Sequence, residues 1–197
     1  MKVDVRPLTK SRWRDVEELF SRPGASIPRG CWCMYYRKTG GHGGVGPAAE
    51  NKKGLKSLVD RGYVPGLIGY HDGRPVGWIS LSPREDYPKL QRSPVMKPVD
   101  DKPVWSIVCF FVDKEARGKG ASEQLLKGAM DYARANGARL LEAYPVDKDE
   151  PSHADSMWFG AKRMYDRAGF KEVARRKENR PVVRKPIRPR AGKATSR

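Results

Sequence analysis

Apolar and polar positions alternate along most of the chain in patterns that predict short strands and amphipathic helices in turn. Period-two stretches and short apolar runs predict strands at residues 2–8, 66–70, 76–81, 104–112, 140–146, 170–177 and 181–187. Apolar positions three and four residues apart predict helices at about residues 12–21, 48–61, 121–135 and 157–168. This order predicts an α/β fold with a mixed central sheet and flanking helices in a single domain, including a right-handed parallel crossover over residues 104–146.

Turn residues and irregular segments separate these elements. Asp72 and Gly73 lie between the second and third predicted strands and are typical of a tight hairpin turn. Residues 25–47 are irregular and glycine-rich around an aromatic segment at 31–37. A polar, proline-rich loop covers residues 82–103, and long loops in compact domains are often functional. Residues 104–112 are almost wholly apolar, which predicts a strand buried on both faces.

Positive charge is concentrated at the C-terminus. The 197 residues include 40 Lys and Arg against 23 Asp and Glu, a net charge of +17, and residues 175–197 contribute ten basic residues and one acid, or +9. We expect a folded domain at 1–188 and a basic disordered tail at 189–197, where alanine is the only apolar residue. Such a tail either binds nucleic acid by neutralising phosphates or remains a solvated extension, and we favour the extension.

Signals for membranes, disulfides and metals are weak. The longest apolar run, residues 107–112, is far shorter than the roughly 18 residues that span a bilayer, and polar residues interrupt any secretory segment. We therefore expect a cytoplasmic protein without a membrane partner. Three cysteines cannot form a disulfide scaffold. Cys31 and Cys33 with His42 form an incomplete metal-ligand pattern, so no metal is expected.

The turn between the predicted strand at 104–112 and the following helix carries the clearest chemical signal. Gly118 and Gly120 let a ligand approach the backbone closely, and the first N–H groups of a helix have no internal partner. Arg117 and Lys119 add positive charge at the same place. These residues predict an anion site suited to phosphate.

Two familiar phosphate-binding motifs do not fit this chain. Counted from Gly118, the third glycine of a dinucleotide-binding motif is replaced by Glu123, and residues 41–48 lack the lysine of a Walker loop. The turn instead resembles the acyl-CoA-binding motif of the GNAT superfamily of N-acetyltransferases, Arg/Gln-x-x-Gly-x-Gly/Ala. The match consists of Val112, Arg117 and Gly120, and the last small position of the pattern is occupied by Ser122 instead of glycine or alanine.

A second GNAT motif supports this resemblance. Residues 161–170 resemble Ala-x-x-Leu-Tyr-x-x-x-Gly-Phe, with Trp158 in place of the asparagine usual three residues earlier. The chain is also similar to a poorly characterised bacterial GNAT subgroup at Trp32-Cys33 and at residues 83–87 and 103–112. Together the resemblances cover about residues 2–187 and imply a GNAT-like fold.

The resemblance implies acetyl-CoA as the acyl donor. The pantetheine arm would pair with the end of the buried strand, and backbone amides of the turn would hold the pyrophosphate. The implied cofactor-binding residues are Phe110, Phe111, Val112, Arg117, Gly118, Lys119, Gly120, Ala121 and Ser122. Tyr165 would protonate the departing thiolate. The acetyl group would pass to an amine of a small-molecule or peptidyl acceptor by direct attack in a ternary complex, without an acyl-enzyme.

A base for the acceptor is harder to identify. An amine that is protonated at neutral pH must lose a proton before it attacks. Some GNAT enzymes use a glutamate six residues before the valine of the first motif, and Ser106 occupies that position here. Glu85, Asp86 and Glu142 are the remaining candidates, and a chain of water molecules is the alternative.

The acceptor itself is constrained only loosely. Trp32, Tyr35 and Tyr36 are candidates for one wall of the acceptor groove, with packing under a loop as the alternative. The net positive charge disfavours a strongly cationic acceptor. The rival function is a catalytically inactive GNAT-like fold that binds nucleic acid through its basic tail. Dimers are common among GNAT proteins, so the resemblance is also compatible with a homodimer.

Overall fold

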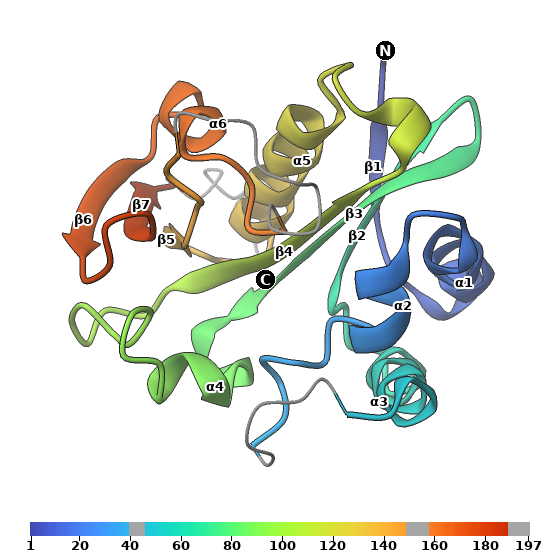
Figure 1. Ribbon diagram of the computed structural model, residues 1–197, viewed down its shortest axis with the longest axis horizontal. Helices are drawn as coiled ribbons and strands as arrows, with labels where there is room; N and C mark the ends of the chain where they lie inside the picture. The colour runs from blue at the N-terminus through green and yellow to red at the C-terminus, as the bar shows by residue number, and fades with distance from the viewer. Residues whose placement is uncertain (40–45, 149–157, 189–197) are drawn as a thin grey trace, which may run out of the picture.

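A seven-stranded sheet forms the centre of the computed structural model, which describes residues 1–39, 46–148 and 158–188 (Figure 1). The strands lie in the order β1 (Asp4–Pro7), β2 (Gly66–His71), β3 (Arg74–Pro83), β4 (Trp105–Val112), β5 (Leu140–Ala143), β7 (Pro181–Pro186) and β6 (Lys171–Arg175). Neighbours β4 and β5 run parallel, with α5 between them in sequence, and the other neighbouring pairs are antiparallel. The predicted mixed sheet is therefore confirmed.

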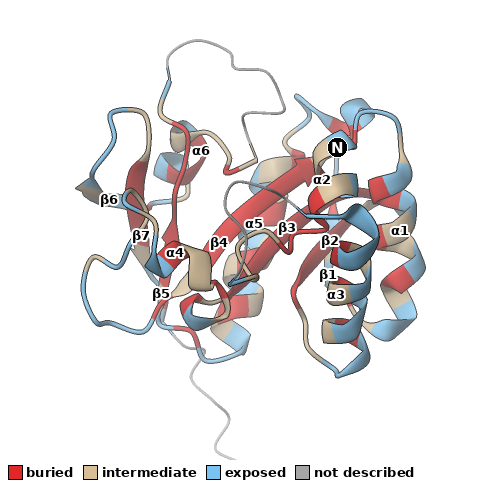
Figure 2. Cartoon of the chain, turned by 60° about the horizontal axis from the view of Figure 1, so that its bottom comes forward, coloured by how far each residue is buried: buried red, intermediate tan, exposed pale blue. Residues whose placement is uncertain are grey.

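Helices cover both faces of this sheet (Figures 1 and 2). α1 (Trp13–Ser21), α2 (Ser26–Cys31) and α3 (Ala48–Asp60) pack on one face, and α5 (Ala121–Ala135) packs on the other. Shorter elements are α4 (Pro88–Gln91), α6 (Lys162–Arg167) and the 3-10 turns Lys10–Arg12, Arg84–Asp86 and Lys114–Ala116. No helix in the described part of the chain is long and apolar enough to cross a membrane.

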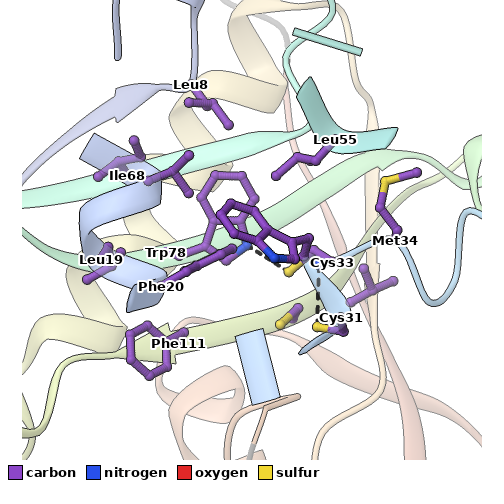
Figure 3. Packing of buried hydrophobic residues seen from close by; sticks show 14 of the residues in the cluster. Leu8, Leu19, Phe20, Cys31, Cys33, Met34, Leu55, Ile68, Trp78 and Phe111 are labelled. Atoms are coloured by element: carbon purple, nitrogen blue, oxygen red, sulfur yellow. Dashed lines mark hydrogen bonds between the residues drawn. The ribbon is translucent and has the colours of Figure 1, made fainter. Parts of the chain in front are cut away.

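Successive strand residues divide between the two faces because side chains alternate along a strand. Trp78 and Phe111 pack with the helices α1 to α3, whereas their neighbours Ile79 and Phe110 pack with α5. On the first face, the Phe20 ring meets Trp78 edge-on at 5.7 Å and Phe111 at 6.2 Å between ring centroids (Figure 3). As its apolar run predicts, β4 is buried on both faces.

Most predicted elements are present close to their expected bounds. Asp72 and Gly73 form the hairpin turn with φ of 49° and 77°, as a two-residue hairpin turn requires. The helix predicted over 157–168 is limited to α6, and the strand predicted over 140–146 ends at Ala143.

The sequence pattern does not predict α2, because six residues are too few to show a helical period. The glycine-rich residues 40–45, with His42, and the tail at 189–197 lie outside the described residues.

Candidate active site

The outer edge of β4 is open along its second half. β5 pairs with the first three residues of β4 and then ends. Beyond β4, the amide of Asp113 donates to the Val76 carbonyl on β3 at 2.9 Å. Because amides alternate in direction along a strand, the N–H groups of Phe110 and Val112 face the opposite, open edge. There the Phe110 amide donates to the Trp158 carbonyl at 2.5 Å.

The turn from β4 to α5 presents an uncrowded backbone next to this edge. Gly118 and Gly120 have φ of 71° and 77°, a left-handed conformation that side-chain-bearing residues rarely adopt. Gly120 is the N-cap of α5, and Glu123 Oε2, at 3.6 Å, is the nearest atom that an added Cβ would meet. The Arg117 Nε donates to the Val112 carbonyl at 3.0 Å. This turn therefore joins the open strand edge to a helix start whose first amides suit an anion.

A cavity of about 540 Å³ lies where this turn, the end of β4 and the start of α6 meet. It is lined by Phe110, Phe111, Val112, Arg117, Gly118, Gly120, Ser122, Glu123, Gly160, Ala161, Arg163, Met164 and Arg167. Seven of the nine residues expected to bind the cofactor are among these; Lys119 and Ala121 are not, and Ala121 is buried. Three arginines against one glutamate make this cofactor cavity positively charged, which fits a pyrophosphate.

A second cavity, of about 370 Å³, borders the preceding residues of β4. It is lined by Ile27, Cys31, Cys33, Tyr35, Tyr36, Val108, Cys109 and Trp158. Val108 and Cys109 directly precede the β4 residues of the cofactor cavity, and Trp158 lies two residues before Gly160 of that cavity. The two cavities therefore adjoin along β4, and we call the second one the apolar cavity.

Trp32 does not line the apolar cavity, although Tyr35 and Tyr36 do. The Trp32 side chain is buried in the core and stacks on Trp13 at 5.9 Å between ring centroids. Trp32 and Cys33 both have left-handed backbones, with φ of 46° and 50°. This conformation directs the indole into the core while Cys33 faces the cavity. Trp32 therefore lies in the core next to this cavity's walls, whereas Tyr35 and Tyr36 are in the cavity lining.

A sequence model described as the Acetyltransferase (GNAT) family matches residues 46–170, which is more than half of the chain. The protein belongs to the GNAT acetyltransferase family. Its match covers β2 to β5, both motifs and the lining of the cofactor cavity.

Solved structures show the same GNAT fold at low sequence identity. An N-acetyltransferase from Staphylococcus aureus Mu50 aligns with a TM-score of 0.54 and 15% identity over 94% of this chain and 99% of its own. The PaiA N-acetyltransferase from Thermoplasma acidophilum, in complex with coenzyme A, aligns with a TM-score of 0.52 and 14% identity over 95% of this chain and 100% of its own. A polyamine N-acetyltransferase from Drosophila melanogaster aligns with a TM-score of 0.53 and 14% identity over 94% of this chain and 99% of its own. No curated protein matches the chain by sequence.

Tyr165, the tyrosine of the second GNAT motif, lies just behind the cofactor cavity. Its side chain is fully buried, and its hydroxyl donates to the Phe159 carbonyl at 3.0 Å. Burial raises the pKa of Tyr165 well above its ordinary value. A Cβ added to Gly160, which lines the cavity, would lie 3.3 Å from the Tyr165 ring. Tyr165 therefore packs against Gly160 and Phe110, two residues of the cavity lining, without lining the cavity itself.

The candidate bases Glu85 and Asp86 lie elsewhere. Asp86 lines a third cavity, of about 710 Å³, beside α3. The Tyr63 hydroxyl donates to its carboxylate, and Arg37 Nη1 lies 3.8 Å away. Burial raises the pKa of Asp86, and the positive charge of Arg37 opposes the rise. Glu85 is exposed, and neither acid lines the cofactor cavity or the apolar cavity.

Glu142, the third candidate base, is buried between two arginines. Arg184 Nε donates to its carboxylate at 2.7 Å, and Arg84 Nη1 donates to the other oxygen. The Tyr144 hydroxyl donates to Glu142 at 2.6 Å and lies 3.0 Å from the hydroxyl of Ser106, which occupies the family's glutamate position. Both carboxylate oxygens of Glu142 therefore belong to a buried ion-pair network with Arg84 and Arg184, and Glu142 lines neither cavity on β4.

The three cysteines are buried and free. Trp78 Nε1 donates to Cys33 Sγ at 3.0 Å, and the Cys33 amide donates to Cys31 Sγ at 3.3 Å (Figure 3). Hydrogen bonds between the thiols, together with burial, raise the pKa of Cys31 and of Cys33, which keeps both protonated. Among the described residues, no group of three or more His, Cys, Asp and Glu is placed to hold a metal ion.

Proposed function

We propose that this protein transfers the acetyl group of acetyl-CoA to an amine acceptor by direct attack in a ternary complex. The observation that carries the proposal is the positively charged cofactor cavity beside the open edge of β4. A donor with an extended amide-containing arm and a pyrophosphate needs both features together: a strand edge beyond the end of β5 for the arm, and helix-start amides for the phosphates.

Each part of the donor has a matching part of the cavity. Phe110, Phe111 and Val112 would align the pantetheine arm, and the outward Val112 amide would stabilise negative charge on the thioester oxygen during attack. The bound donor supplies the activated acyl group. The pyrophosphate would lie against the turn formed by Arg117, Gly118, Lys119, Gly120, Ala121 and Ser122.

The adjoining apolar cavity supports direct attack by the acceptor. An amine placed there would reach the thioester across Cys109 and Phe110. A covalent route would instead need an activated nucleophile next to a base. Cys109 is the nucleophilic side chain at the junction, and none of the described residues that line the two cavities is a histidine. A covalent route through Cys109 would therefore have no histidine base among the described residues of this lining.

The proton steps follow from the same geometry. Tyr165 is our candidate acid for the departing thiolate, because its ring lies behind Gly160 at the cofactor cavity. Glu85 and Asp86 line neither cavity on β4, which favours removal of the acceptor proton through water. An amine acceptor agrees with the polyamine N-acetyltransferase of Drosophila melanogaster among the structural neighbours.

Calorimetric titration of acetyl-CoA tests the cofactor site. Gly120→Glu would place a carboxylate where the pyrophosphate binds, and we expect at least ~100-fold weaker binding from like-charge repulsion. Gly137→Glu is the matched control: Gly137 is also left-handed, with φ of 84°, has open space for a Cβ and lies beyond the other end of α5. The control should bind acetyl-CoA as the unmodified protein does.

The same titration distinguishes binding of acetyl-CoA at this site from non-specific electrostatic attraction to the basic chain. It is repeated at two salt concentrations and with a chain that ends after residue 188. Stoichiometric binding that persists at higher salt and without residues 189–197 supports the proposal. Binding that disappears with the tail, or that Gly120→Glu leaves unchanged, would contradict it and favour a nucleic-acid-binding role.

A further inference from the structure

The apolar cavity adjoins the cofactor cavity on the side where the proposed acceptor must lie. Its volume of about 370 Å³ is near the lower end of cavities that hold small molecules. The walls come from three separate parts of the chain: α2 and the aromatic segment after it, the middle of β4, and Trp158. The cavity therefore fits a compact ligand that enters between α2 and β4.

The lining of the apolar cavity offers an ammonium group no ion-pair partner among the described residues. Among the described residues, it contains aliphatic, thiol and aromatic side chains and no carboxylate. Transfer of an ammonium group from water into such surroundings without a partner is strongly unfavourable. The reacting amine escapes this cost because it must be neutral when it attacks, but a second ammonium on the same molecule would not.

Two cationic side chains next to the cavity also disfavour a second ammonium group on the acceptor. Lys89 Nζ lies 3.8 Å from the centroid of the Tyr35 ring, which lines the cavity. The Arg180 guanidinium lies 4.6 Å from the centroid of the Phe159 ring, and Phe159 packs on Tyr36 at 5.8 Å. Both positive charges would repel a further cation on the acceptor.

We infer that the acceptor of this site is a monoamine with an apolar or aromatic body and no second positive charge, so polyamines are poor substrates. The inference rests on the proposed function, because it concerns the acceptor of that reaction. The inferred acceptor differs from the polyamines named for the Drosophila melanogaster neighbour.

Hexylamine and 1,5-diaminopentane test the inference directly. They have the same chain length, and the terminal methyl of the first is an ammonium in the second. With saturating acetyl-CoA and release of the CoA thiol as the readout, we expect kcat/KM to be at least ~10-fold higher for hexylamine. Phenethylamine should be accepted as well. A ratio of one or less would overturn the inference.

A charge placed in the wall provides the second test. Ile27 lines the cavity and is half-buried, so Ile27→Glu would supply the missing partner for a second ammonium. We expect the ratio of hexylamine to 1,5-diaminopentane to fall at least ~10-fold. Leu58→Glu is the matched control, because Leu58 is equally half-buried on the same face of the sheet but lines the cavity beside Asp86. An equal fall in both variants would overturn the inference.

Calorimetry of acetyl-CoA on the same samples separates the two proposals. If acetyl-CoA does not bind the unmodified protein, the proposed function fails. If acetyl-CoA binds but hexylamine neither reacts nor binds to the protein saturated with CoA, the acceptor inference is wrong while the cofactor site stands. Preference for the diamine with intact acetyl-CoA binding would likewise overturn the acceptor inference and leave the proposed function in place.

Discussion

The turn at residues 117–122, proposed to bind phosphate, and the aromatic segment at residues 31–36 were both predicted to form part of the site, and the structure arranges their residues differently. At the turn, the expected residues lie together: Arg117, Gly118, Gly120 and Ser122 line one cavity with the end of β4. In the aromatic segment the expected residues separate, because Tyr35 and Tyr36 line the apolar cavity while Trp32 packs in the core.

The difference arises from what each segment contributes. The turn contributes backbone, and glycines in a strand-to-helix connection specify backbone geometry locally. The aromatic segment contributes side chains, whose direction depends on the backbone that carries them. Two successive left-handed residues, Trp32 and Cys33, set that direction here, and neither residue type is typical of such a conformation. The local sequence therefore identifies a backbone site more reliably than a side-chain site.

Trp32→Ala should have the largest effect on stability. Because the indole is buried against Trp13, its removal should lower the free energy of unfolding by ~3–5 kcal/mol in urea denaturation. Tyr35→Ala is the comparison within the same segment, and its half-buried ring should cost ~1–2 kcal/mol. An equal loss of unfolding free energy in the two variants would contradict the core packing of Trp32.

Tyr165→Phe tests a side-chain role outside that segment. If the hydroxyl protonates the thiolate, kcat should fall ~100-fold while the affinity for acetyl-CoA changes less than about threefold. Tyr132→Phe is the control, since Tyr132 is a half-buried tyrosine on α5 that lines neither cavity on β4. An unchanged kcat in Tyr165→Phe, with normal folding, would leave the hydroxyl only its bond to Phe159.

Gly118→Ala measures how far the turn depends on its backbone. Gly118 and Gly137 have φ of 71° and 84°, and a Cβ at either position would meet nothing within 4 Å. Alanine should therefore cost about 1 kcal/mol of stability at both positions. Only Gly118→Ala should also weaken acetyl-CoA binding, by ~3–10-fold, because it changes the phosphate-binding backbone. Equal acetyl-CoA affinity in the two variants would show that the turn tolerates a side chain.

Asp86→Asn should have the smallest effect. Because the pKa of Asp86 is raised in the folded state, the folded protein binds the carboxyl proton more tightly than the unfolded chain does. Protonation of Asp86 therefore adds to the free energy of unfolding at acid pH, and this contribution is lost as the pH rises through the raised pKa. The difference in unfolding free energy between the unmodified protein and Asp86→Asn should therefore decrease from about pH 3 to about pH 7, by less than about 1 kcal/mol. Urea denaturation across this range measures it.

The same Asp86→Asn variant tests the base. With Asp86 in the cavity beside α3, kcat/KM should change less than about threefold. A loss of ~100-fold would identify Asp86 as the base and would contradict the water route.

Features that depend on local sequence could be predicted. The hairpin at Asp72 and Gly73, the buried strand β4 and the parallel return to β5 all follow from apolar runs and turn residues. The short helix α2 could not, because a six-residue helix is held by its packing and not by its own propensity.

Contacts between distant residues were equally inaccessible. Glu142 looks like an ordinary strand acid in the sequence, and its role depends on Arg84 and Arg184, which lie 58 and 42 residues away. The apolar cavity likewise combines Ile27, Cys109 and Trp158, and no local pattern links these three. Tertiary folding alone brings such residues together.

Under the proposed function, the bond from the Phe110 amide to the Trp158 carbonyl would couple the two halves of the site thermodynamically. The main chain of Trp158 occupies an edge position that an extended donor arm would use, and its side chain lines the cavity assigned to the acceptor. A donor that pairs with Phe110 must therefore displace the residue that shapes the neighbouring cavity. Occupancy of one cavity would then change the affinity of the other by the same factor in both directions, and a single peptide group would link the binding of the two proposed substrates.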